Sequence, residues 1–253
     1  TRENPYICAM QHAKAILKAT LGAPSLMRLP VAASRLPDVH QASIAPVLVP
    51  IRSIGPGERA VIAAHLLALE PHDRYLRFGY AASDEQVQRY VDGLNFEQDE
   101  IFGIYNRRLE LIAMAHLAFA PAEHASECAE FGVSVAKHAR GRGYGAQLFE
   151  RAEVVARNAG VRMLFIHALS ENAAMLKIAR KAGASVVRSG SEAEAHLELP
   201  EPTLDSRMSE IALEHFAEVD FRLKARAKQF WSLLQGLQEV RSGVQEARSK
   251  SSA

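Results

Sequence analysis

A glycine-rich turn at residues 140–145 carries the clearest chemical signal in the sequence. It reads Arg-Gly-Arg-Gly-Tyr-Gly and joins a stretch typical of a strand to a stretch typical of a helix. Such a turn can present several backbone N–H groups to one anion, with the positive end of the helix dipole behind them. The glycines permit close backbone approach, and Arg140 and Arg142 add positive charge. The segment therefore predicts a binding site for a pyrophosphate.

Two common nucleotide-binding motifs do not fit this turn. A P-loop would end in Lys-Ser/Thr, which is absent here. A dinucleotide fingerprint spaces its glycines as Gly-x-Gly-x-x-Gly, whereas Gly141, Gly143 and Gly145 fall at every second position. The next strand, expected at 163–168, also lacks the acidic residue that binds a ribose in such sites.

The rest of the pattern predicts a series of strands and helices along the chain. Ser83 with Gln86 three residues later predicts a capping box at a helix start, and 106–108 predicts a β-hairpin turn. The expected strands are 46–54, 101–105, 109–119, 127–135, 163–168, 184–188 and 193–199, and the expected helices are 58–69, 83–94, 146–158 and 172–182.

The chain divides into an N-terminal extension at 1–40, a central domain at 41–200 and a helical segment at 201–253. The basic first 35 residues are typical either of a weakly ordered extension with a short helix at 9–21, or of an organellar transit peptide. Beyond 205 an apolar stripe recurs in alternating three- and four-residue steps, which favours either packing on the domain or a homodimer through this helix. The stripe consists of Phe216, Val219, Leu223, Phe230, Leu233, Leu237 and Val240, with one polar interruption at Arg226.

Composition sets limits on the partners and on the compartment. The net charge of +1 gives no overall field for nucleic acid or for an anionic membrane, so we expect neither as a partner. No apolar run reaches the length of a membrane span. Cys8 and Cys128 have neither zinc-site nor redox-pair spacing, which favours a reducing, cytoplasmic compartment and no metal.

Arg140, Gly143 and Gly145 fill the signature Arg/Gln-x-x-Gly-x-Gly/Ala, so the chain resembles the GNAT acetyltransferase superfamily. The order of the elements over about 46–199 is similar too. The resemblance implies an α/β (α+β) fold, with a central mixed, mostly antiparallel sheet splayed at the acyl-CoA site and flanked by helices. It also implies an acyl-CoA-dependent N-acyltransferase that uses acetyl-CoA as co-substrate.

The same resemblance implies positions for the parts of acetyl-CoA. The pantetheine arm would follow the edge of the strand at 131–135, near Asn172, and the pyrophosphate would lie on 140–146. The cofactor-binding residues so implied are Phe131, Val133, Val135, Arg140, Gly141, Arg142, Gly143, Tyr144, Gly145, Ala146 and Asn172.

The catalytic residues are less standard. Many members of the superfamily have a tyrosine acid where this chain has Ala179. The segments 172–183 and 73–78 resemble the bacterial Pat-type protein lysine acetyltransferases, which often lack that tyrosine and carry a glutamate where Glu130 stands. Partial burial would raise the pKa of Glu130 and make it a better general base. The alternative is a carboxylate paired with an arginine or exposed at a strand edge.

The expected function is acetyl transfer to a primary amine, with a protein lysine as acceptor. A small-molecule amine is one alternative, and a non-catalytic acyl-CoA-binding module is another. Other reactive side chains have simpler structural interpretations, and no motif indicates a covalent acyl-enzyme on Cys128. These side chains are His116, His138, His167, Lys177, Arg180 and Lys181.

Overall fold

The computed structural model describes residues 49–120 and 128–250, with side chains described to residue 229. The chain separates into two units, 1–47 and 48–253, and the described residues all belong to the second. The predictions for 1–40 therefore lie outside the described residues. The strand predicted at 46–54 is wrong in extent, because its described part contains only a two-residue strand, Arg52–Ser53.

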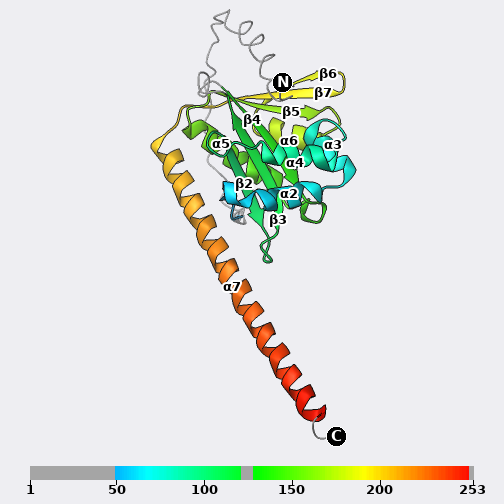
Figure 1. The fold of residues 1–253 in the computed structure, drawn as a ribbon. Helices are drawn as coiled ribbons and strands as arrows, with labels where there is room; N and C mark the ends of the chain where they lie inside the picture. Colours follow the sequence, from blue (N-terminus) through cyan, green and yellow to red (C-terminus); the bar gives the residue numbers. More distant parts are fainter. Residues whose placement is uncertain (1–48, 121–127, 251–253) are drawn as a thin grey trace, which may run out of the picture. The chain divides into compact units, whose positions relative to one another are not determined.

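Figure 1 shows the described elements around one central sheet. In chain order they are β1 (Arg52–Ser53), η1 (Pro56–Glu58), α2 (Arg59–Leu67), α3 (Pro71–Phe78), α4 (Asp84–Asp92), β2 (Glu100–Tyr105), β3 (Leu111–Phe119), β4 (Cys128–Val135), η3 (Lys137–Ala139), α5 (Tyr144–Asn158), β5 (Met163–Leu169), α6 (Ala173–Lys181), β6 (Ser185–Ser189), β7 (Glu192–Glu198) and α7 (Leu204–Lys250).

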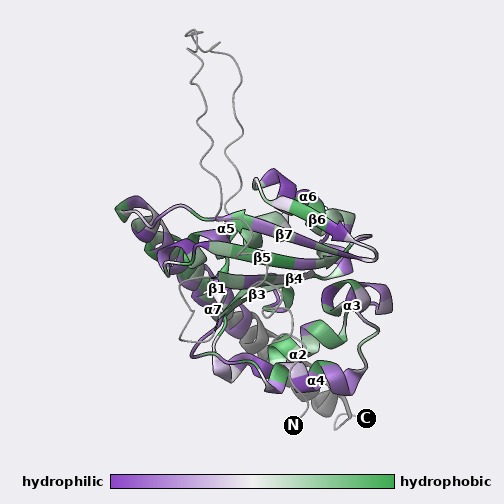
Figure 2. Cartoon of the chain, turned by 90° about the horizontal axis from the view of Figure 1, so that it is seen from above, coloured by the Kyte–Doolittle hydropathy of each residue, from purple (hydrophilic) through white to green (hydrophobic). Residues whose placement is uncertain are grey.

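The described strands form one sheet in the order β1-β2-β3-β4-β5-β7-β6. The β4–β5 pair is parallel, and the other neighbours are antiparallel. Helices α5 and α6 lie on one side of the sheet, and α2, α3 and α4 lie on the other (Figure 2). The predicted fold class, a mixed and mostly antiparallel sheet flanked by helices with a C-terminal helix, is confirmed.

An apolar cluster covers each face of the sheet, so successive residues of the central strands are apolar although they point to opposite faces. Phe102 and Phe131 pack with Phe149 of α5 in one layer. Ile101 and Met114 pack with α2 and α4 in the other. Because both faces of its central strands are covered, the sheet holds β4 and β5 in fixed positions.

Three local features differ from the sequence prediction. Helix α3 was not expected, although Pro71 stands in its first turn and Gly79 ends it at a φ of 79°. Strand β3 begins at Leu111 rather than at 109, because Leu109 takes a positive φ of 62° in the hairpin. Helix α5 begins at Tyr144 rather than at Ala146, with Gly143 as its N-cap.

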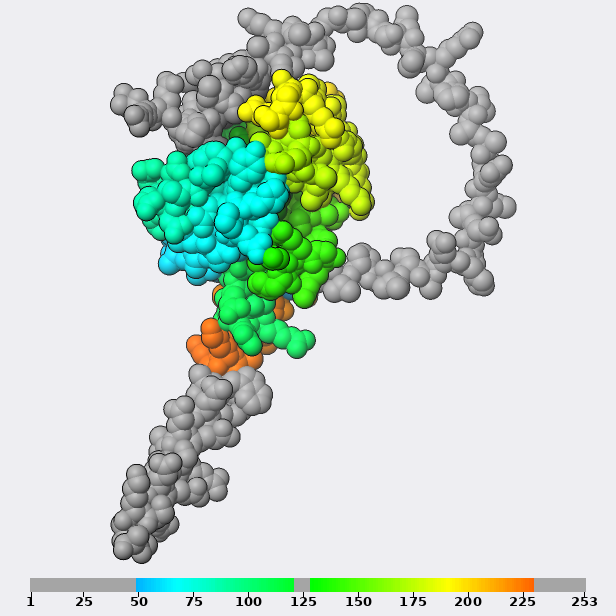
Figure 3. Space-filling view, turned by 90° about the vertical axis from the view of Figure 1, so that its right-hand side faces the viewer, coloured from blue at the N-terminus to red at the C-terminus, as the bar shows by residue number. Residues whose placement is uncertain are grey.

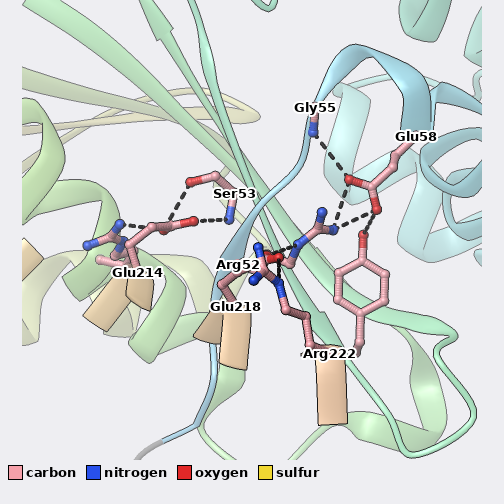
Figure 4. A network of polar contacts seen from close by, with 9 residues as sticks. Arg52, Ser53, Gly55, Glu58, Glu214, Glu218 and Arg222 are labelled. Carbon is pink, nitrogen blue, oxygen red and sulfur yellow. Dashed lines mark hydrogen bonds and ion pairs between the residues drawn. The ribbon is translucent and has the colours of Figure 1, made fainter. Parts of the chain in front are cut away.

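Helix α7 docks on β1 and α5 through a charged face (Figure 4). The Glu214 carboxylate accepts a hydrogen bond from Arg151 Nη2 at 2.8 Å and one from the Ser53 backbone N–H at 3.3 Å. Arg52 donates to Glu58 at 2.7 Å and to Glu218 at 3.1 Å. These polar contacts, together with buried Ala217 and with Phe221 packed on Tyr105, attach the start of the long helix to the domain.

We expect Glu214→Ala to lower the free energy of unfolding by about 2 kcal/mol. The Arg151 side chain is only 4% exposed, and the substitution removes its carboxylate partner. Urea denaturation would measure the change. Arg222→Ala is the matched control, since its pair with Glu218 is exposed and should contribute less than about 0.5 kcal/mol. Equal losses in the two variants would contradict this role of Glu214.

Candidate active site

Strands β4 and β5 separate in the middle of the sheet. Their parallel pairing covers only Cys128–Glu130 against Met163–Phe165. Strand β4 continues to Val135 along β3, while β5 continues to Leu169 along β7. The sheet therefore opens after Glu130, as the sequence resemblance implied for the acyl-CoA site.

Alternation along β4 decides which backbone groups face this opening. The Ala136 N–H donates to the Ile112 carbonyl, and the Cys128 carbonyl accepts from Ala120, so the even-numbered residues direct their backbone groups toward β3. The N–H and C=O groups of Phe131, Val133 and Val135 consequently face the β5 side. An extended chain lying in the opening could pair with them as a strand would.

The glycine turn leads directly from β4 into α5. Gly141 and Gly143 have positive φ values of 74° and 79°, which an L side chain rarely adopts. Gly143 is the N-cap of a 15-residue helix, so the free N–H groups of its first turn lie beside the end of β4. Gly145 lies close to α6, because a β-carbon there would stand 3.2 Å from Ile178 Cδ1. These features suit an anion.

The Arg140 side chain is 45% exposed and has polar partners on α3 and at the end of β4. Its guanidinium forms an ion pair with Asp73 of α3, and its Nε donates to the Val135 carbonyl at 3.3 Å. Arg142 is exposed, and Tyr144 and Ala146 lie in the first turn of α5. The fixed charge of Arg140 is thus partly neutralised by Asp73, and Arg142 is the more available of the two cations.

Helix α6 begins at an Asn172 cap and contains Ala179, at the position where the sequence resemblance expects a tyrosine. The Asn172 side chain accepts a hydrogen bond from the Met175 N–H at 3.1 Å, so this residue is the N-cap of α6. Ala179, which occupies the place of the usual tyrosine, is fully buried at 0% exposure. No proton donor stands at that position in this chain.

Glu130 lies on the face of β4 opposite to Phe131 and contacts an imidazole. His167 Nδ1 of β5 is 3.3 Å from Glu130 Oε1, and His167 Nε2 is 3.6 Å from Glu194 Oε1 of β7. His196 Nε2 is 3.3 Å from the same Glu194 oxygen. Burial lowers the pKa of His167, but the hydrogen bond and charge of Glu130, with the charges of Glu194 and Glu192, outweigh it and raise the pKa above its usual value.

The contact with His167 was not among the interpretations of Glu130 that the sequence offered. The Glu130 side chain is 22% exposed. Sequence reasoning treated His167 as a structural residue and did not identify Glu194 or His196. Alternation in β7 leaves both of these half-buried beside fully buried Ala195, and that pattern was the available signal.

A second polar chain lines the same face of the sheet. Arg77 donates to the Tyr90 hydroxyl at 2.8 Å, which contacts His116 Nδ1 at 2.8 Å. His116 Nε2 lies 3.1 Å from Asp99, so both ring nitrogens of this histidine have polar partners. The guanidinium of Arg77 lies over Gly132, where a β-carbon would stand 2.8 Å from Nη2.

A buried histidine also fixes the outer part of β4. His65 of α2 lies 2.9 Å from the Leu111 carbonyl and 2.9 Å from Ser134 Oγ. Burial lowers its pKa to about 4, so the ring is neutral near pH 7. Nδ1–H therefore donates to the carbonyl, and the Ser134 hydroxyl donates to Nε2. His65 thus fixes the part of β4 whose odd-numbered residues face the opening.

The remaining candidates have exposed or modest surroundings. His138, Lys177, Arg180 and Lys181 are exposed, and Cys128 is half-buried. Among the described residues, no group of histidine, cysteine and carboxylate side chains could hold a metal ion. None of the described helices is both long enough and apolar enough to cross a membrane.

In Figure 3 one face of the molecule brings together the segments that form this site. The cyan residues of the α3–α4 region, the bright green residues of the glycine turn and α5, and the yellow-green residues of β5 and α6 adjoin there. Contacts of α3 with β4 and β5 agree with this arrangement.

Several solved structures are similar to this one. The GNAT domain of PAT from S. lividans has a TM-score of 0.51 at 22% sequence identity, covering 61% of this chain and 96% of that one. An N-acetyltransferase from Staphylococcus aureus Mu50 has a TM-score of 0.48 at 18% identity, covering 59% and 98%. The protein yncA from Salmonella typhimurium, solved with its cofactor acetyl-CoA, has a TM-score of 0.47 at 16% identity, covering 61% and 96%. Comparison with curated proteins gives no match.

A family model supplies the sequence evidence. The model described as "Acetyltransferase (GNAT) family" matches residues 67–184, a segment that contains the separation of β4 and β5, the glycine turn and α6. The likeness to the PAT domain shows the same fold. Residues 67–184 are therefore similar to the GNAT acetyltransferase family.

Proposed function

We propose that this domain transfers an acetyl group from acetyl-CoA to a primary amine, with Glu130 as general base. The observation that carries the proposal is the opening between β4 and β5, which lies beside a helix N-terminus and starts at the Glu130 carboxylate. A strand edge, an anion site and a carboxylate thus occur in one place.

The residues around the opening fit acetyl-CoA. Phe131, Val133 and Val135 present backbone groups that suit the amides of the pantetheine arm, and Asn172 stands at the start of α6. The turn from Arg140 to Ala146, including Gly141, Arg142, Gly143, Tyr144 and Gly145, suits the pyrophosphate through its N–H groups. The co-substrate supplies an acetyl group already activated as a thioester.

The role proposed for Glu130 follows from the protonation of amines. A lysine side chain with a pKa of about 10.4 is protonated at pH 7, and deprotonation there costs about 4.6 kcal/mol. Glu130 takes this proton, the nitrogen–carbon bond forms, and the carbon–sulfur bond breaks. A thiolate with a pKa of about 8.5 can leave without a strong acid and then take a proton from water. Burial of Ala179 at the tyrosine position is compatible with such a departure.

A protein lysine is the acceptor that we propose. Its support is the resemblance of 172–183 and 73–78 to Pat-type enzymes, together with the carboxylates of Glu130 and Glu194, which favour a cationic amine. The test is release of free thiol from acetyl-CoA with a panel of lysine-bearing proteins and small amines. Turnover restricted to small amines would reject the lysine acceptor. Binding of acetyl-CoA without turnover on any acceptor would indicate a non-catalytic module.

We further propose that α7 pairs with α7 of a second copy. The charged side of the helix docks on the domain, and this leaves apolar side chains on the other side exposed. The exposed residues are Met208, Ile211, Phe216, Val219 and Leu223. From Phe216 the stripe continues in alternating three- and four-residue steps through Phe230, Leu233, Leu237 and Val240, with the charged Arg226 as its one polar position. This spacing is typical of a helix that pairs with another along a coiled-coil seam, and α7 of a second copy carries the same stripe.

A charge in the stripe should separate the copies. We expect Leu223→Glu to convert a dimer into a monomer in sedimentation velocity, because the carboxylate would lie in the apolar seam. Leu223 is 62% exposed within one chain, so folding should survive. Arg207→Glu, also exposed on α7, is the control and should remain dimeric. A wild-type protein that sediments as a monomer at tens of micromolar would contradict the proposal.

A further inference from the structure

Three adjacent strands, β4, β5 and β7, place a histidine between two carboxylates, one of which is the candidate base Glu130. The β5–β7 register places His167 opposite Glu194, and the β4–β5 register places Glu130 opposite Phe165, two residues before His167. Strand alternation therefore puts Glu130, His167 and Glu194 on one face of the sheet. Their side chains are 22%, 34% and 24% exposed, so the group lies at the boundary of the core and the solvent.

We propose that His167, positioned by Glu194, accepts the proton from Glu130 and passes it to solvent after each turnover. The inference rests on the proposed function, because it needs the proton that the amine gives up. The Glu130 O–H bond breaks as a bond forms from its proton to His167 Nδ1. The imidazolium then lies between two carboxylates and releases a proton from Nε2 to water. Protons alone move in these steps, so the relay needs no other reactant.

The geometry orders the two ring nitrogens. For Nδ1 to accept a proton, the neutral ring must carry its hydrogen on Nε2. Once Glu130 has taken the proton of the amine, it is a donor to Nδ1, and the Nε2–H then faces Glu194 Oε1 at 3.6 Å. His196 Nε2 lies 3.3 Å from the same oxygen, while Phe165 packs edge-on against the His196 ring at 5.0 Å. Glu194 Oε1 therefore lies near both imidazoles, and Glu194 acts as a positioning residue for His167.

The surroundings also set when the relay can work. The groups that face His167 are Glu130 from β4 with Glu192 and Glu194 from β7, and on the far side of Glu130 the guanidinium of Arg77 from α3 lies against Gly132. The three carboxylates outweigh burial, so the pKa of His167 is raised. A ring that is already protonated cannot accept another proton. The rate should therefore fall as the pH drops through the raised pKa of His167.

The test combines pH profiles with NMR titration of His167. In Glu194→Gln the acid limb of kcat/KM for the amine should move to lower pH, together with the His167 titration. Glu192 is exposed, and Glu192→Gln should move both less. In His167→Gln this limb should disappear, kcat should fall about 100-fold, and KM for acetyl-CoA should stay unchanged. A purely structural His167 would leave the position of the limb unaltered.

The outcomes separate the two proposals. If the wild type acetylates amines, but the limb stays in place in Glu194→Gln while the NMR titration moves, the relay is overturned and the proposed function stands. A wild type that binds acetyl-CoA and acetylates no amine overturns the proposed function, and the relay with it. A joint shift of the limb and the titration supports the relay.

Discussion

Glu130→Gln should lower kcat about 100- to 1,000-fold at pH 7 and leave KM for acetyl-CoA nearly unchanged. The amide keeps the size of the side chain but cannot take the proton of an ammonium. The side chain is only partly buried and points away from the Phe131 side of β4, so binding of the co-substrate at the strand edge should persist. The measurement is thiol release with a saturating amine across a range of pH.

The control for this variant is Glu97→Gln, which alters an exposed carboxylate in the turn after α4. It should retain the wild-type kcat. At high pH, where more of the amine is already neutral, the deficit of Glu130→Gln should shrink, because the lost group is a base. Wild-type kcat in Glu130→Gln at neutral pH would remove Glu130 from the mechanism.

Gly143→Val should abolish the thermal stabilisation that coenzyme A gives to the protein. Gly143 is the N-cap of α5 with a φ of 79°, a conformation that is a genuine outlier for a β-branched residue. Relaxation of that strain would turn the N–H groups of the first turn away from a bound pyrophosphate. A ligand at 100 times its Kd stabilises the folded state by about 2.7 kcal/mol, and this increment should vanish.

Gly160→Val is the matched control for that substitution. Gly160 has a similar φ of 83° just beyond the other end of α5, and a β-carbon added there would meet no atom within 4 Å. Both variants should lose intrinsic stability, but Gly160→Val should keep the shift in melting temperature that coenzyme A produces. Loss of the shift in both variants, or in neither, would mean that the phosphate site lies elsewhere.

Local sequence signals predicted most of the elements. Ser83 and Gln86 form the predicted capping box, and Asn172 caps the helix that follows β5. Helix α3 escaped prediction because it is short and, on average, polar. The early start of α5 escaped because three glycines read as a turn, whereas Gly145 belongs to the helix and gives close packing against Ile178.

The sequence predicted only part of the candidate site, because some of its contacts depend on strand register. Glu130 stands out locally, because a carboxylate is unusual in an apolar strand. Its neighbours are set by strand register, which joins His167 to Glu194 across a helix and a further strand. Sequence spacing does not fix that register. In α7 the apolar stripe was visible, but the polar contacts of Glu214 and Glu218 decide which side docks on the domain.

Titration calorimetry with coenzyme A tests the central claim most directly, namely that the opening after Glu130 and the turn at 140–145 bind a thioester carrier. We expect a saturable heat with one site per chain, lost in Gly143→Val and retained in Gly160→Val. The absence of any binding heat with folded wild-type protein, checked over several temperatures, would contradict the claim.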